Sequence, residues 1–209
     1  MPNWVFNNIY ITSDTPEEIE SIVEFVNGET CFDFNKIIPR PAELDVESGG
    51  NKGKSTIFYL SKHIDMLDDA DFVSKLKRNI PFESWRKQDV INKGGGTKDE
   101  DGNLYKAGEQ YVNNIINHGY ATWYEWSINN WGTKWNACDP TVTTQKHEVN
   151  FSFDTAWSYP EPIIVALSKK FPNAVFEIYA EEESMAFAFD AKMKNGIEYD
   201  FVDRTEGVE

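Results

Sequence analysis

Apolar residues near the start of the chain follow first a strand pattern and then a helix pattern. Residues 4–11 are aromatic or β-branched around two Asn, which is typical of a strand. Residues 16–26 begin with Pro and two acids and then place apolar residues at i, i+3, i+4 and i+7, which predicts an amphipathic helix. Residues 31–38 alternate again, so a second strand is expected there.

The end of the chain repeats this order. Apolar and polar residues alternate over 147–154, a helix is expected over 160–171, and strands are expected over 174–179 and 185–193. The Asn195-Gly196 pair after them is a hairpin signal that leads into one more strand. Each end of the chain therefore reads as a β-α-β unit.

Two such units that pair into one antiparallel sheet make a ferredoxin-like sandwich, and we predict an α+β fold of that class. Residues 1–44 and 145–203 are expected to build the sandwich. Residues 45–144, which show interrupted helical patterns and polar loops, are expected to be a long, mostly helical insertion. Residues 204–209 are expected to be an acidic tail.

Composition narrows the possible functions. The 209 residues carry a net charge of −15, and 14% of them are aromatic, including seven Trp. A chain this acidic is short of the Lys and Arg that neutralise phosphates, so direct nucleic-acid binding is not expected. No apolar run approaches the roughly 18–20 residues that cross a bilayer, and the start lacks a signal peptide, so we expect a cytoplasmic protein without membrane contact. Two cysteines and three histidines show no ligand spacing, so neither a metal nor another cofactor is expected.

Two groups of residues are candidates for an interaction surface. Acidic residues of the first helix and of a Glu run between two late strands could form one acidic face, which would imitate nucleic-acid phosphates: Glu17, Glu18, Glu24, Glu181, Glu182 and Glu183. Tryptophans of the segment 123–137 could form a partner or ligand platform, because Trp dominates binding hot spots: Trp123, Trp126, Trp131 and Trp135. The alternative for the Glu run is a solvated loop without a binding role. The alternative for the Trp segment is that it packs the insertion on the sheet.

A catalytic site is the competing interpretation. Glu125, Asp154 and His118 could serve a hydrolase if they converge in a Trp-rich cleft. No nucleophile motif accompanies them, so the sequence favours a protein that is not an enzyme. Stacking of single-stranded nucleic acid on the Trp segment is a weaker third possibility, against which the charge counts.

Several motifs together resemble one family. They occur in order along the chain as Met1–Trp4, Asn7-Asn8, Phe34 with Ile37–Leu44, Trp123–Trp126 with Asn130–Ala137, and Phe153–Pro160. The resemblance is to the Api92-like, or YubB-like, ferredoxin-like-domain family of phages and plasmids. Tyr159 stands where a second Pro is expected, and residues 45–110 carry no motif of the resemblance.

The resemblance implies a ferredoxin-like fold and a mobile-element origin. It implies no iron–sulfur cluster, which two cysteines cannot hold. It supplies no catalytic residues. We therefore expect an accessory protein that binds and modulates a host protein in the bacterial cytoplasm. The expected partner handles nucleic acid through a basic groove, and the expected role is that of an anti-defence inhibitor, such as an anti-CRISPR or anti-restriction protein. The oligomeric state stays open.

Overall fold

The structure, a computed structural model, describes residues 3–205 and divides into two compact units. Met1–Pro39 and Ser127–Glu209 make up the first, here called the sheet unit. Arg40–Trp126 make up the second, the helical unit. These divisions fall at 39/40 and 126/127, not at the expected 44/45 and 144/145. Residues 127–144, which we expected in the insertion, include most of the sheet strand Cys138–Gln145. Most of the expected acidic tail, residues 206–209, lies outside the described residues.

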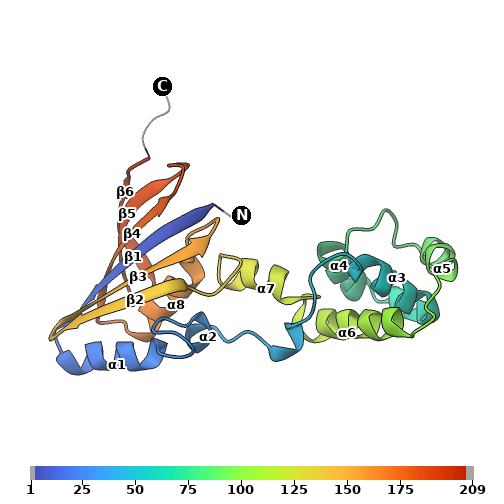
Figure 1. Cartoon of the computed structure of the whole chain (residues 1–209), viewed down its shortest axis with the longest axis horizontal. Helices are drawn as coiled ribbons and strands as arrows, with labels where there is room; N and C mark the ends of the chain where they lie inside the picture. Colours follow the sequence, from blue (N-terminus) through green and yellow to red (C-terminus); the bar gives the residue numbers. More distant parts are fainter. Residues whose placement is uncertain (1–2, 206–209) are drawn as a thin grey trace. The chain divides into compact units, whose positions relative to one another are not determined.

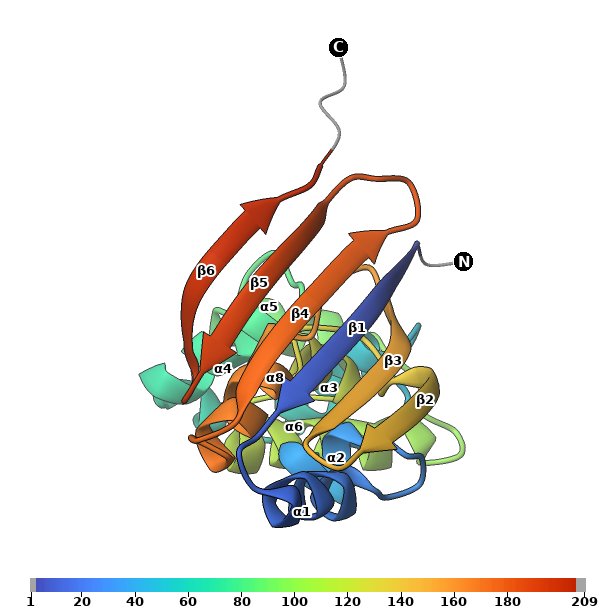
Figure 2. The same ribbon diagram turned by 90° about the vertical axis from the view of Figure 1, so that its left-hand side faces the viewer.

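The sheet unit holds six strands in one antiparallel sheet, in the order β2-β3-β1-β4-β5-β6 (Figure 1). Three helices, α1 (Pro16–Val26), α2 (Phe34–Ile37) and α8 (Glu161–Lys170), lie behind the sheet on one side (Figure 2). The strands are β1 (Trp4–Thr12), β2 (Cys138–Gln145), β3 (Glu148–Ala156), β4 (Val175–Glu182), β5 (Ala188–Lys194) and β6 (Ile197–Asp203).

The expected ferredoxin-like α+β class is confirmed. β1-α1-β2 and β3-α8-β4 form the two halves, and their strands lie in the order β2-β3-β1-β4. The β5–β6 hairpin extends the sheet beyond β4, and its turn has positive φ angles at Asn195 (51°) and Gly196 (70°), as the Asn-Gly signal predicts. The helical unit is inserted between α1 and β2, inside the first half.

The strand expected over residues 31–38 is wrong. Instead, Asp33 caps the short helix α2, and its carboxylate accepts hydrogen bonds from the Asn35 backbone N–H (2.9 Å) and the Asn136 side chain (2.7 Å). Phe32 and Phe34 alternate as strand residues would, but both pack into the core. The ring of Phe32 stacks on that of Phe153 at 4.8 Å between centroids. Packing of two aromatic rings under the sheet thus produces a pattern that local reasoning takes for a strand.

The helical unit consists of α3 (Lys52–Lys62), α4 (Ala70–Asn79), α5 (Lys87–Gly95) and α6 (Asn103–His118), with short 3₁₀ turns at Ala42–Leu44 and Ile64–Asp68. Its own core includes the fully buried Leu60, Leu76, Val90, Val112 and Ile115. Helix α7 (Trp123–Asn130) contains the division between the two units at 126/127. The described part of the chain contains no helix with the length and apolarity of a membrane span.

Candidate functional site

The sheet face opposite α1, α2 and α8 is the candidate functional surface, and we call it the open face. Strand alternation assigns each residue of β1 to one side. Val5, Asn7, Ile9 and Ile11 are buried toward the helices, so Trp4, Phe6, Asn8 and Tyr10 lie on the open face. Cross-strand partners share a face, which places the open-face residues of the other strands through their register with β1.

Aromatic side chains collect where β1 begins. The ring centroids of Trp4 and Trp135 are 6.0 Å apart, and those of Phe6 and Tyr179 are 6.4 Å apart. The Lys134 ammonium lies 4.3 Å from the ring centroid of Trp135 and 5.0 Å from that of Trp157, within cation–π range. We call Trp4, Phe6, Trp135, Trp157 and Tyr179 the aromatic cluster.

Trp157 is unusual within this cluster. It follows β3, its φ is +69°, and its side chain is 46% exposed. A bulky side chain in the left-handed region costs on the order of 1–2 kcal/mol, so the surrounding backbone must hold it. The Trp157 N–H donates to the Asn3 carbonyl at 2.9 Å. The fold therefore keeps a large, strained and exposed indole beside the start of β1.

Carboxylates surround the aromatic cluster and continue across the open face. Tyr10 donates its hydroxyl hydrogen bond to Glu148, and Tyr179 donates to Glu181. These bonds to the carboxylates are the main reason that the pKa of both phenols is raised. The open face carries six carboxylates against four cations: Glu148, Asp154, Glu177, Glu181, Asp190 and Asp200 against Lys134, Lys192, Lys194 and Arg204.

A shallow cavity of about 370 Å³ lies on this face between β1 and β6. Lys192 lines it and pairs with Glu177 at 2.8 Å, while Arg204 pairs with Asp190 at 2.5 Å. Two of the four cations of the open face are therefore already paired with carboxylates of the same face. The surface can attract cationic groups from outside, and its aromatic rings can hold them.

The six acidic residues expected to form one face are not brought together. Glu17, Glu18 and Glu24 lie on α1, which covers the opposite side of the sheet from Glu181. Glu182 is buried, and its carboxylate accepts hydrogen bonds from the Ser184 N–H (2.9 Å) and the Ala186 N–H (3.1 Å). Glu183 is exposed after β4 ends. Strand alternation separates consecutive Glu residues, so a run in sequence does not form a patch in space.

The four tryptophans expected as one platform divide between the two units. Trp131 is buried against Phe34 (5.7 Å between ring centroids), and its indole N–H donates to the Ile38 carbonyl at 2.9 Å, so it is a core residue. Trp126 is buried, and Trp123 packs on the Arg40 guanidinium at 5.9 Å, both in the helical unit. Of the four, Trp135 belongs to the open face.

The three candidate catalytic residues are also divided. His118, at the end of α6, faces Glu43 at 3.7 Å, and Glu125 pairs with Lys52 and accepts from Thr122 at 2.7 Å. Both lie in the helical unit. Asp154 lies on the open face, where partial burial and the nearby Asp139 raise its pKa. Within residues 3–205, no cluster of His, Cys, Asp or Glu is arranged to hold a metal ion.

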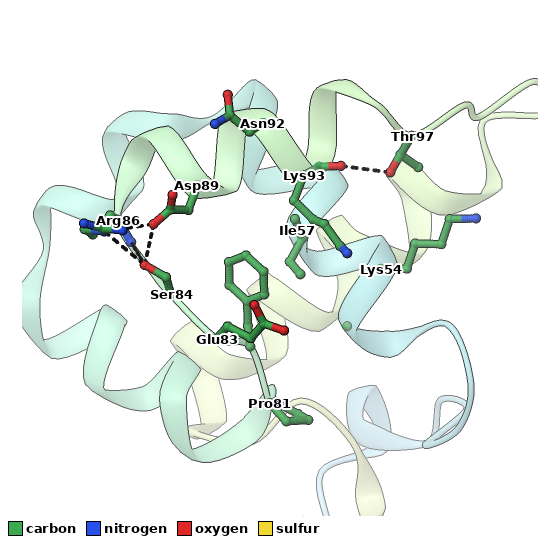
Figure 3. Close-up of a pocket in the computed structure, with 12 residues that line it drawn as sticks. Lys54, Ile57, Pro81, Glu83, Ser84, Arg86, Asp89, Asn92, Lys93 and Thr97 are labelled. Atoms are coloured by element: carbon green, nitrogen blue, oxygen red, sulfur yellow. Dashed lines mark hydrogen bonds and ion pairs between the residues drawn. The ribbon is translucent and has the colours of Figure 1, made fainter.

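The helical unit has a larger cavity of about 730 Å³ between α3, α5 and the loop that joins α4 to α5 (Figure 3). Arg86 and Ser84 bind Asp89 at 2.8 Å and 2.5 Å and form one end of its lining. Lys54, Glu83 and Lys93 also line the cavity. Charges of both signs alternate around it and all these side chains are at least partly exposed, so it favours no ligand class. The larger volume of this cavity alone does not make it a better candidate site than the open face.

Sequence reasoning missed most of the open face. Trp4, Phe6 and Tyr10 were read together with their buried neighbours as one apolar strand. A signal was present, because a strand that is buried on one side seldom repeats large aromatic residues on its other side without a use for them.

Comparison with known proteins supports the expected resemblance. Residues 130–209 match the family model described as the ferredoxin-like domain in Api92-like protein. The chain is similar to the crystal structure of a protein api92 from Yersinia pseudotuberculosis, with a TM-score of 0.51 and 11% identity over 99% of each chain. That identity is low enough that the likeness concerns the fold alone. No curated protein matches the chain. Residues 130–209 are thus similar in sequence to the ferredoxin-like domain in Api92-like protein, in agreement with the fold of the sheet unit.

Proposed function

We propose that this protein is a non-enzymatic binding module that captures a basic segment of another protein on its open face. The observation that carries the proposal is the combination of six carboxylates with an exposed aromatic cluster on one side of the sheet. Lys and Arg side chains are recognised by such a surface in two ways, through ion pairs and through contact with ring faces.

The Tyr–Glu hydrogen bonds add to this argument. Tyr10 and Tyr179 hold the carboxylates of Glu148 and Glu181 in place before any partner arrives. A preorganised acceptor loses less side-chain entropy on binding than a mobile one does. Fixed negative charge also speeds the approach of a basic partner and makes association sensitive to salt.

RNA is the obvious competitor for an open ferredoxin-like sheet, since such sheets can stack bases on aromatic residues. Here Phe6 of the aromatic cluster is paired with Asp154 on one side and Glu181 on the other, and these carboxylates repel phosphates. The same charges suit the basic groove of a nucleic-acid-handling host protein. Inhibition of such a protein by a phage or plasmid accessory factor in the bacterial cytoplasm is the biological setting that we propose for this surface.

The experiment compares two variants that change the net charge equally. The first neutralises the open face with Glu148→Gln, Asp154→Asn and Glu181→Gln. The second neutralises exposed residues of α1 with Glu17→Gln, Glu20→Gln and Glu24→Gln. A partner captured from a nuclease-treated bacterial lysate is purified and titrated against both variants and the unchanged protein.

We expect the open-face variant to weaken binding by about tenfold or more, and the α1 variant by less than about twofold. Equal weakening would mean that only net charge matters, and an unaffected open-face variant would mean that the partner docks elsewhere. Retention of a labelled single-stranded oligonucleotide by the unchanged protein at low salt would favour nucleic acid. Each of these results overturns the proposal.

A further inference from the structure

The outer edge of the sheet presents a strand that is exposed along its whole length. The sheet order ends at β6, and all seven β6 residues are exposed. Apolar side chains are prominent among them, with Ile197 66%, Tyr199 56% and Phe201 53% exposed. An edge strand offers backbone N–H and C=O groups to an additional strand. Within residues 3–205, no strand pairs with the outer side of β6.

The strand at the opposite edge, β2, is less suited to pairing with an additional strand. β2 contains Pro140, and its register with β3 shifts between Cys138 and Thr141. Pro and irregular pairing are the usual protections of an edge against further strands. The register of β6 with β5 also shifts, between Lys192 and Met193. However, β6 contains no Pro, and it contains no Lys or Arg. The two edges therefore differ in a way that leaves β6 able to accept a neighbour.

We propose that β6 accepts an extended basic segment of the partner as a seventh strand of the sheet. This proposal rests on the proposed function and specifies how the partner docks. The charge of β6 indicates which kind of strand pairs with it, because its charged residues are all acidic: Glu198, Asp200 and Asp203. A second copy of β6 would bring further acids against these, whereas a strand with Lys and Arg complements them.

The register of β6 defines what the added strand meets. Asp200 pairs with Lys192 and Val202 pairs with Asp190, so both lie on the open face, where they line the 370 Å³ cavity. Phe201 lies on the other side, and its ring stacks on that of Phe189 at 5.4 Å. Glu198 and Asp203, which pair with Met193 and Phe189, lie on the same side as Phe201. An added strand would therefore meet Asp200 beside the open face, and two acids together with an aromatic surface behind it. An extended segment that combines basic and apolar residues fits this edge.

The test uses a labelled peptide in which Lys or Arg alternates with Val, blocked at both ends. Two matched peptides carry backbone N-methyl groups on alternate residues, in one frame or the other. Methylation removes N–H donors and leaves the side chains unchanged. In an added strand only alternate N–H groups point toward β6. We expect one frame to weaken binding by about tenfold or more and the other frame to bind like the parent peptide.

Hydrogen exchange locates the contact. Backbone amides of β6 should gain protection when the parent peptide binds, and those of β2 should not. Equal binding of all three peptides, protection of β2 in place of β6, or no binding of the parent peptide overturns strand addition. So does a concentration-dependent dimer, seen by sedimentation, with β6 protected in the absence of peptide.

These failures are distinguishable from failure of the proposed function. Asp200 and the rest of β6 are unchanged in the open-face variant Glu148→Gln, Asp154→Asn, Glu181→Gln. If that variant weakens capture of the partner while both methylated peptides bind like the parent, the open face binds a basic segment and β6 does not pair with it. If the variant binds the partner normally, the proposed function fails first.

Discussion

Tyr179 and Glu181 lie two residues apart on β4, and their side chains meet on the open face in a hydrogen bond from the phenol to the carboxylate. Tyr10 makes the same bond to Glu148 across the β1–β3 pair. Each bond stabilises the protonated phenol, and each carboxylate stays an acceptor. Two tyrosines thereby orient two of the charges on which the proposed function depends.

This arrangement predicts the titration of the tyrosines. The pKa of Tyr10 and of Tyr179 lies above the ordinary 10.0, mainly because of the carboxylate hydrogen bond. The stabilisation from each pair is therefore complete below pH 10 and is lost as pH rises through the folded-state pKa. Glu148→Gln with Glu181→Gln should shift part of the tyrosinate absorbance change to lower pH.

Tyr10→Phe and Tyr179→Phe assign that part of the curve to the two residues. Glu17→Gln with Glu24→Gln, on the other side of the sheet, serves as the control and should leave the curve unchanged. An unaltered titration in the Glu148 and Glu181 double variant would show that these carboxylates do not hold the phenols.

The second prediction concerns Trp131, which the sequence offered as a binding residue and the structure buries. Trp131→Ala should lower the free energy of unfolding by about 3–5 kcal/mol. Trp131→Phe should cost about 1–3 kcal/mol, because the Ile38 carbonyl loses its donor. Hydrogen exchange of the β1 and β3 amides in increasing urea measures both. Trp157→Ala serves as the control at an exposed Trp. If it lowered the free energy of unfolding as much as Trp131→Ala does, the assignment of Trp131 to the core would be contradicted.

The third prediction compares two helical glycines of the helical unit. A Cβ at Gly108 of α6 would lie 2.2 Å from the Ser55 carbonyl oxygen of α3, so Gly108→Ala must push the two helices apart. A Cβ at Gly95, the last residue of α5, meets nothing within 4 Å. Gly108→Ala should destabilise by about 1–3 kcal/mol, the usual range for overpacking.

Gly95→Ala should be neutral or stabilising by up to about 1 kcal/mol. Thermal unfolding followed by circular dichroism measures both variants. Equal melting temperatures would mean that α3 and α6 do not approach as closely as described.

The fourth prediction concerns the stability of the protein at low pH, which depends on Glu182. Hydrogen bonds from Ser184, followed by those from the backbone N–H groups of Ala186 and Ser184, hold the pKa of Glu182 below its ordinary 4.5 despite burial. Its stabilisation is therefore present above pH 4.5 and is lost as pH falls through the lower folded-state pKa. The stability difference between the unchanged protein and Glu182→Gln should be largest near neutral pH and shrink in acid.

Glu183→Gln removes the same charge from the neighbouring exposed residue and should show no such trend. Urea unfolding at a series of pH values follows both variants. A difference for Glu182→Gln that stays constant down to strongly acidic pH would mean that this carboxylate is not the group that loses its hydrogen bonds.

Local sequence patterns were sufficient to predict those parts of the fold that depend on neighbouring residues. The helix at Pro16–Val26, the alternation of β3 and the Asn195-Gly196 turn all follow from local periodicity and turn chemistry. Together with the family motifs they were sufficient for the ferredoxin-like class, because the order of strands and helices limits the possible sheets.

Tertiary structure alone decided which segment completes the first half and which side chains meet on the open face. β2 is an exposed edge strand with few apolar residues, so it pairs through its backbone and leaves almost no periodic signal. Contacts such as Tyr10–Glu148 and Trp4–Trp135 join residues that are far apart in the chain. They depend on strand register, where a shift of one residue exchanges the two faces of a strand, and register is set only when the whole sheet packs against its helices.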